Sequence, residues 1–134
     1  MIEIDTIEKL NKIIKKDSRV IVVVFTTTSC TPCNLFRDPL IEMEKRFANT
    51  CLVINIDIDK YKSFSEYYNI SSIPLVIYYY KQIFWENLTF VGADIGKAYE
   101  NVSILLTQHN DGVQPITAAL KKNPVYDLDS INFS

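Results

Sequence analysis

The sequence lacks the features of exported and membrane-spanning proteins. Its first five residues contain neither the basic block nor the apolar block of a secretory signal peptide. Apolar runs are short, as at residues 20–25, and stay far below the roughly 20 residues that a membrane-spanning helix needs. We therefore expect a cytoplasmic protein that has no membrane partner.

An excess of charge of one sign is also missing. Fourteen Lys and Arg residues stand against sixteen Asp and Glu residues, which gives a formal net charge of -2. A nucleic-acid-binding surface is rich in basic residues, so we expect no direct contact with nucleic acid. The aromatic residues from Tyr78 to Phe90, which include Trp85, are typical of a strand core rather than of a stacking surface.

Cysteine is scarce, with three residues in a chain of 134. In a reducing compartment three thiols do not make a disulfide framework, so their spacing is more informative than their number. Cys51 stands alone at the head of a predicted strand and is interpreted as a small core residue, with a regulatory thiol as the less favoured alternative. Outside the Cys30/Cys33 pair only Cys51 and His109 are soft metal ligands, and neither stands at ligand spacing, so we expect no metal site.

Hydrophobic patterning predicts one domain of alternating strands and helices. With 134 residues, 48% of them hydrophobic, the chain has enough apolar side chains for one core and is too short for two ordinary domains. Strands are predicted at residues 2–4, 20–25, 51–58, 75–80 and 83–91, and helices at residues 7–14, 35–47, 61–69 and 98–106. Pro39 lies inside the second helix and is expected to kink it.

These elements predict an α/β fold built on a mixed sheet of four to five strands with flanking helices. The continuous β-branched run at residues 20–25 is typical of a central strand that is covered on both faces. The helix that follows it leads to an alternating strand at residues 51–58, which implies a right-handed parallel crossover. The strands at residues 75–80 and 83–91 are close enough in sequence to pair antiparallel.

We assign the folded domain to residues 1–108 and a C-terminal extension to residues 109–134. His109 is expected on a solvated loop after the last helix. Apolar residues near residues 116–120 predict one or two further helical turns, and the final dozen residues have the pattern of an irregular tail.

The strongest chemical signal is the pair Cys30 and Cys33, which stands between a buried strand and a helix. Free backbone N–H groups and the dipole at a helix N-terminus stabilise a thiolate, which lowers the pKa of Cys30 from about 8.5 toward 7. Cys33 lies one helical turn further on, so its sulfur reaches Cys30 and can close an intramolecular disulfide. Pro32 suits the first helical turn, where no backbone N–H is needed. The pattern predicts thiol–disulfide exchange, with half of a zinc site or two inert core thiols as less favoured alternatives.

The dipeptide Ile73-Pro74 is the second signal. A proline directly before the strand at residues 75–80 cannot join a central ladder, so it belongs at the first position of the strand or in a turn. By itself it would be an ordinary loop proline.

Together these motifs resemble the thioredoxin family over about residues 1–108. Cys30-Thr31-Pro32-Cys33 is similar to the active-site dithiol of that family, and Ile73-Pro74 is similar to its cis-proline dipeptide. The resemblance implies a thioredoxin fold, in which the proline lies beside the dithiol. Asp59 and Gly92 also fall on recognisable family positions.

The resemblance also implies roles for individual residues. Cys30 would be the nucleophile and Cys33 the buried resolving thiol, and the backbone of Ile73 would pair with an incoming substrate strand. The residues that would contact the substrate are Thr31, Pro32, Ile73 and Pro74.

Four departures from the family pattern are present. Val24 stands where thioredoxins usually have a buried Asp that helps to move the proton of the resolving cysteine, which implies slower release of the mixed disulfide. Ser29 replaces the usual Trp before the first cysteine, and Asn34 replaces the usual Lys after the second. Pro39 sits one place later than the common helix proline.

A second resemblance is to the spliceosomal Dim family, whose members have the thioredoxin fold and act as assembly modules in pre-mRNA splicing. It rests on residues 18–25, the run Tyr78-Tyr79-Tyr80, the absence of the buried Asp, and residues 123–128. Dim-type proteins lack an intact C-x-x-C motif. The retained cysteine pair therefore favours a thiol–disulfide oxidoreductase over an assembly module. Under this alternative the protein would be nuclear and not catalytic.

We therefore expect a thioredoxin-like oxidoreductase that acts on protein disulfides and is restored by a separate reductase. It would need no bound cofactor, and we expect it to be a monomer that takes part in cell redox homeostasis. The alternatives are the Dim-type interaction module and a redox sensor that closes its own disulfide under oxidation.

Overall fold

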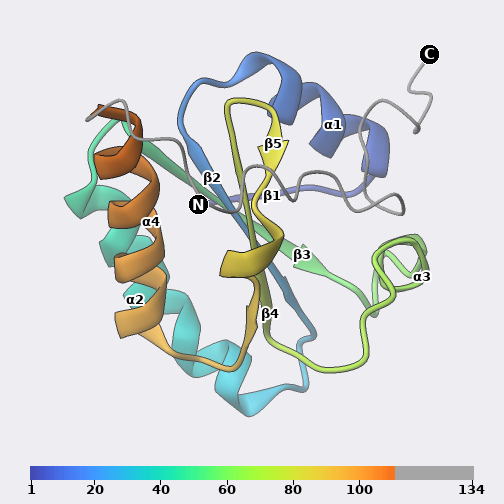
Figure 1. The fold of residues 1–134 in the computed structure, drawn as a ribbon. Helices are drawn as coiled ribbons and strands as arrows, with labels where there is room; N and C mark the ends of the chain where they lie inside the picture. Colours follow the sequence, from blue (N-terminus) through green and yellow to red (C-terminus); the bar gives the residue numbers. More distant parts are fainter. Residues whose placement is uncertain (111–134) are drawn as a thin grey trace.

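Strand β2 (Val20–Thr26) lies at the centre of a mixed β-sheet. The computed structural model of the chain describes residues 1–110, and their side chains as far as Thr107. Strand β2 pairs in parallel with β3 (Cys51–Asp57) and antiparallel with β4 (Leu75–Tyr80), as Figure 1 shows. Every residue of β2 is buried, which confirms the prediction that this β-branched run is the central strand.

The remaining strands are short and lie toward the edges of the sheet. Strand β1 (Ile2–Glu3) runs parallel to β3. Strands β5 (Ile83–Phe84) and β6 (Phe90–Val91) both pair antiparallel with β4. The described residues therefore form a sheet of six strands, in the order β1-β3-β2-β4-β5 with β6 beside β4, where the sequence predicts four to five.

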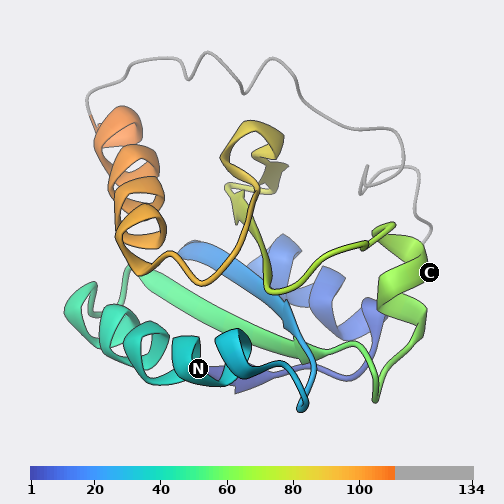
Figure 2. The same cartoon turned by 90° about the horizontal axis from the view of Figure 1, so that it is seen from below.

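Helices cover both faces of the sheet (Figures 1 and 2). Helices α2 (Thr31–Arg46) and α4 (Ile95–Asn110) lie side by side on one face. Helices α1 (Ile7–Lys16) and α3 (Ser63–Tyr67) lie on the other. This arrangement follows from the sequence because β2 and β4 are apolar on both faces and need cover on each side.

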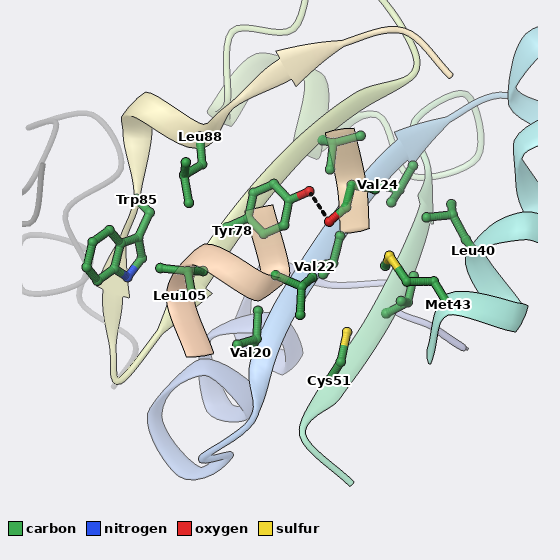
Figure 3. Packing of buried hydrophobic residues seen from close by; sticks show 14 of the residues in the cluster. Val20, Val22, Val24, Leu40, Met43, Cys51, Tyr78, Trp85, Leu88 and Leu105 are labelled. Atoms are coloured by element: carbon green, nitrogen blue, oxygen red, sulfur yellow. Dashed lines mark hydrogen bonds between the residues drawn. The ribbon is translucent and has the colours of Figure 1, made fainter. Parts of the chain in front are cut away.

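Two apolar clusters fill the spaces between the sheet and the helices. The α2/α4 cluster, shown in Figure 3, includes Val20, Val22, Val24, Leu40, Met43, Cys51, Tyr78, Trp85, Leu88 and Leu105. The cluster on the opposite face takes the alternate strand residues and packs them against α1 and α3, and it includes Leu10, Ile14, Ile21, Val23, Leu52, Ile54, Ile56 and Phe64. The tyrosine and tryptophan side chains of the β4–β5 region are buried, as predicted for a strand core.

The single strand predicted at residues 83–91 is wrong. This segment contains β5 and β6 with the 3-10 turn η1 (Glu86–Leu88) between them. The backbone N–H of Leu88 donates to the Trp85 carbonyl at 3.0 Å, and the N–H of Thr89 donates to the Glu86 carbonyl at 3.1 Å.

The pairing register explains the interruption. Tyr79 pairs with Phe84 and Val76 with Phe90, so three positions along β4 correspond to six along the returning segment. The three surplus residues have no partners in the ladder. They form the 3-10 turn η1 instead. The Trp85 side chain fills the space beneath the sheet, where its indole Nε1 donates to the Tyr80 carbonyl at 3.3 Å. An alternating apolar pattern does not reveal such an insertion, because it repeats every two residues.

The last helix is longer than the sequence predicts. Helix α4 runs from Ile95 to Asn110, so the backbone of His109 is helical and not in a loop, and the helix continues past the predicted boundary at residue 108. Ala98, Val102 and Leu105 are fully buried on its inner face, in agreement with the predicted stripe. The helical turns predicted near residues 116–120 and the predicted tail lie outside the described residues.

We expect Leu40→Ala to lower the free energy of unfolding by about 3 kcal/mol, because the Leu40 side chain is 2% exposed in the α2/α4 cluster. Leu35, on the same helix, is 72% exposed, and Leu35→Ala should change stability by about 0.5 kcal/mol or less. Urea denaturation of both variants in the reduced state would measure the difference. Equal losses in the two variants would contradict the placement of α2.

Candidate active site

The chain passes from β2 into α2 through a short turn that ends at Cys30. Cys30 is the N-cap residue of α2, with φ -85° and ψ 108°, and its carbonyl accepts from the Asn34 N–H at 3.1 Å. The turn is held by the N–H of Cys30, which donates to the Thr27 carbonyl at 3.3 Å. The Asn34 side chain donates to the Thr28 carbonyl at 3.1 Å. The two cysteines are therefore fixed at the N-terminus of a long helix.

Cys30 and Cys33 form a disulfide in this structure, with their Cα atoms 5.2 Å apart. The two residues have different surroundings, because Cys30 is partly exposed whereas Cys33 is only 4% exposed. The Cys30 Sγ accepts a hydrogen bond from the Cys33 backbone N–H at 3.2 Å. Thr31 and Pro32, between the cysteines, are exposed. An N–H group aimed at the outer sulfur is the arrangement that stabilises a thiolate once the disulfide is reduced.

The Ile73-Pro74 dipeptide lies at the same end of the sheet as the disulfide. Its peptide bond is cis, Pro74 is buried and Ile73 is partly exposed. Leu75 pairs with Phe25, so Pro74 adjoins the end of β2, from which the turn leads to Cys30. None of the hydrogen bonds among the described residues involves the backbone of Ile73. The structure thus places the six residues singled out in the sequence at the same end of the sheet.

Gly92 is hydrogen-bonded to the cis-proline. Its N–H donates to the Pro74 carbonyl at 2.9 Å, and its φ of +114° is a conformation that glycine adopts far more readily than other residues. Next to it, the side chain of Val91 is 56% exposed. Asp59, the other family position, is exposed and donates its backbone N–H to the Asp57 carboxylate at 2.9 Å.

Cys51 belongs to the core and not to the site. It lies at the start of β3, the end away from the disulfide, and Figure 3 places it between Val20 and Met43. Burial raises the pKa of its thiol to about 12, and the nearby Glu44 carboxylate adds to the rise. This placement confirms the interpretation of Cys51 as a small core residue.

A polar pocket lies beneath Cys33, and no sequence motif predicts it. Its volume is about 280 Å³, and its lining includes Cys33, Thr26, Asn55, Asp57, Glu3 and Arg37. These residues come from β1, β2, β3 and α2, which are distant in sequence, so no local motif predicts that they lie together. One signal was available, since Asn55 and Asp57 continue the face on which Cys51 and Val53 are apolar.

Val24, at the position of the missing family Asp, is fully buried. It pairs with Asn55 on one side and Val76 on the other and belongs to the α2/α4 cluster. The sheet beneath the disulfide therefore carries an apolar group at this position.

The described part of the chain shows neither a metal cluster nor a spanning helix. Among the side chains described, which end at Thr107, no group of three or more His, Cys, Asp or Glu could hold a metal ion. No helix in residues 1–110 is long and apolar enough to cross a bilayer.

The comparison with known proteins decides the family. The sequence profile of the Thioredoxin family matches residues 2–99. The chain belongs to the thioredoxin family. Among its relatives, this family member is 27% identical to thioredoxin-1 of Drosophila melanogaster over 62 residues, which are 46% of this chain and 58% of that protein. It is 23% identical to thioredoxin H5 of Arabidopsis thaliana over 107 residues, which are 78% of this chain and 85% of that protein.

Solved structures of thioredoxins have the same fold. The germline-specific thioredoxin Deadhead of Drosophila melanogaster is similar with a TM-score of 0.68 and 25% identity, over 78% of this chain and 99% of that one. Fasciola hepatica thioredoxin has a TM-score of 0.71 at 22% identity, over 77% of this chain and 97% of that one. The predicted thioredoxin fold is confirmed. These comparisons do not support the Dim-type alternative.

We expect the thiols of this thioredoxin-family protein to differ sharply in reactivity. When the reduced, folded protein is treated with iodoacetamide at pH 8, Cys30 should react first and Cys51 should remain unmodified. At that pH a thiol with a pKa of about 12 holds about one thiolate in ten thousand molecules. Mass spectrometry of peptides would identify the modified residues. In 8 M urea Cys51 should react readily, and modification of Cys51 in the folded protein would contradict its burial.

Proposed function

We propose that this protein reduces disulfides in other proteins through the Cys30/Cys33 pair. The observation that carries the proposal is the disulfide at the start of α2, in which one sulfur is partly exposed and receives a backbone N–H while the other is buried. An exposed sulfur can meet a disulfide of another molecule, and a buried one is reserved for the second, intramolecular step. Membership of the thioredoxin family supports the same activity.

The reaction transfers two electrons from the dithiol to the substrate. The Cys30 thiolate attacks one sulfur of the substrate disulfide, which breaks that bond and forms a mixed disulfide. Cys33 then loses its proton and attacks the Cys30 sulfur, which forms the Cys30–Cys33 bond and releases the second substrate thiolate. A separate reductase would return two electrons to the protein. The thiols and disulfides themselves carry the two electrons, so the reaction requires no bound cofactor.

The surface around Cys30 fits an extended substrate segment. The unpaired backbone of Ile73 would hydrogen-bond with the substrate chain in the manner of an added strand. Thr31 and Pro32 would contact the substrate on the helix side, and Pro74 would support it from below. The exposed apolar side chains of Leu35 and Val91 flank this region and would add apolar contact area.

The insulin reduction assay tests the activity. With dithiothreitol as the electron source, the protein should accelerate insulin precipitation, and Cys30→Ser should abolish the acceleration because the nucleophile is lost. Cys51→Ser is the matched control and should keep the activity, since Cys51 is buried at the other end of β3. Precipitation at the uncatalysed rate with the unmodified protein would reject the proposal.

A trapping experiment identifies the substrates. Cys33→Ser should accumulate covalent complexes through Cys30, because the resolving thiol is absent and the mixed disulfide persists. The complexes should disappear on treatment with dithiothreitol and should be missing from the Cys30→Ser variant. Gel electrophoresis without reductant, followed by mass spectrometry, would detect them. If the two variants capture the same proteins, the capture does not proceed through Cys30 and the proposed role of this residue is wrong.

A further inference from the structure

We propose that Asp57 receives the proton that Cys33 loses, through water in the polar pocket beneath the disulfide. This inference rests on the thiol–disulfide exchange proposed above. It assigns a proton acceptor to a chain that has Val24 where a buried carboxylate would otherwise stand.

The apolar side of Cys33 offers no acceptor. The titratable side chains on this side are the thiol of Cys51 and phenols, those of Tyr78 and Tyr80 within the α2/α4 cluster and that of Tyr99 packed against it. A protonated phenol or thiol does not accept a proton from another thiol near neutral pH. Burial raises the pKa of Tyr78 as it raises that of Cys51, so both groups hold their protons near neutral pH. The Tyr78 hydroxyl donates to the Ala98 carbonyl at 3.5 Å, which Figure 3 marks with a dashed line. A proton from Cys33 must therefore leave toward the pocket.

The pocket is suited to carry a proton. Its volume of about 280 Å³ is enough for several water molecules, each of which occupies about 30 Å³ in the liquid. Its wall includes the Thr26 hydroxyl, which donates to the Asn55 Oδ1 at 3.0 Å. The exposed side chains of Glu3 and Arg37 form part of its rim, so the pocket is continuous with solvent.

Asp57 is the carboxylate that is fixed inside this pocket. Its Oδ1 accepts from the backbone N–H groups of Asp59 at 2.9 Å and of Lys60 at 3.1 Å, which holds the carboxylate in one orientation. Its Oδ2 makes no hydrogen bond with any described residue, so this oxygen is available to pocket water. A fixed position and an oxygen without a protein partner suit a proton acceptor that acts through pocket water.

The other charged groups at the pocket have charged or aromatic partners of their own. The Glu3 carboxylate is 55% exposed and lies 3.9 Å from Arg37, at the rim. The Lys60 ammonium lies 5.7 Å from the centre of the Tyr61 ring. The N-terminal ammonium of Met1 is paired with Glu44. Asp57 is therefore the partly buried carboxylate that remains available among the residues lining the pocket.

The proton leaves Cys33 before this sulfur attacks Cys30. The Cys33 thiol gives its proton to a pocket water, and that water gives a proton to Asp57 Oδ2. The Cys33 thiolate then attacks Cys30, the bond between Cys30 and the substrate breaks, and the substrate leaves as a thiolate that takes a proton from solvent. Asp57 afterwards returns its proton to solvent through the open rim of the pocket.

The experiment follows both chemical steps with 5,5'-dithiobis(2-nitrobenzoate), a small coloured disulfide. Attack by Cys30 releases the first nitrothiobenzoate, and attack by Cys33 releases the second, so stopped-flow absorbance separates the proposed function from this inference. Asp57→Asn keeps the Oδ1 acceptor for the turn and removes the base. At pH 6 we expect its second phase to slow by about tenfold while its first phase stays unchanged. The difference should shrink above pH 8, where solvent base ionises Cys33 directly.

Glu3→Gln is the matched control, because it removes a carboxylate from the rim of the same pocket and should leave both phases within about twofold of the unmodified rate. Acetate, which is small enough to enter the pocket, should restore the second phase of Asp57→Asn. If Asp57→Asn folds poorly, Asp57→Ser also offers an acceptor to the turn and should give the same pH profile.

Three results would overturn the inference. An unchanged second phase in Asp57→Asn at every pH would show that another acceptor serves Cys33. An equal loss in Glu3→Gln would show a general effect of charge. A loss that acetate does not restore and that does not depend on pH would show a structural role for Asp57. Absence of the first phase in the unmodified protein would instead reject the proposed function.

Discussion

The pairing of β2 along both of its edges is the constraint on which the rest of the structure depends. A slip of one residue against β3 or β4 would exchange the two faces of the strand and move Val20, Val22 and Val24 out of the α2/α4 cluster. Both faces are buried, so the register is strongly specified. It also fixes which backbone ends meet, since Thr26 lies opposite Asp57 and Phe25 lies opposite Leu75. The start of α2, the end of β3 and the cis-proline are thereby gathered at one end of the sheet.

The sheet face beneath α2 changes character along the strands. Cys51 and Val53 are apolar and belong to the α2/α4 cluster, whereas Asn55 and Asp57, further along β3, line the polar pocket. Strand β2 changes in the same direction, from Val24 to Thr26. The apolar part stabilises the helix on the sheet, and the polar part lies where Cys33 must exchange a proton. Stability and chemistry are thus divided between the two ends of one helix–sheet interface.

Helices and strands could be predicted wherever burial of one or both faces makes the apolar residues repeat at a regular spacing. The β-branched run of β2, the alternation in β3 and the stripe of α4 each follow from the face that the segment buries. The two cysteines and Ile73-Pro74 were found because they are local motifs. The break between β5 and β6 was missed, because the surplus residues in a ladder are defined only by the partner strand. The pocket was missed for a related reason, since its lining comes from four elements that are distant in sequence.

The α2 helix combines two kinds of leucine in neighbouring turns. Leu40 is held in the core, and Leu35 points to solvent one turn after the disulfide. A single exposed apolar side chain is common and needs no functional explanation, so the substrate contact proposed for Leu35 rests on its position near the start of α2.

Gly92 matters for its backbone conformation and not for side-chain packing. A Cβ atom added there would meet nothing within 4 Å, so the absent side chain is not a requirement of internal packing. The space beside its Cα is open, and its backbone N–H holds the Pro74 carbonyl. The φ of +114° is what restricts this position, because a residue with a Cβ atom would strain the backbone there even though the space is open. A substitution would therefore act on the backbone geometry that holds the Pro74 carbonyl, and not by crowding the core.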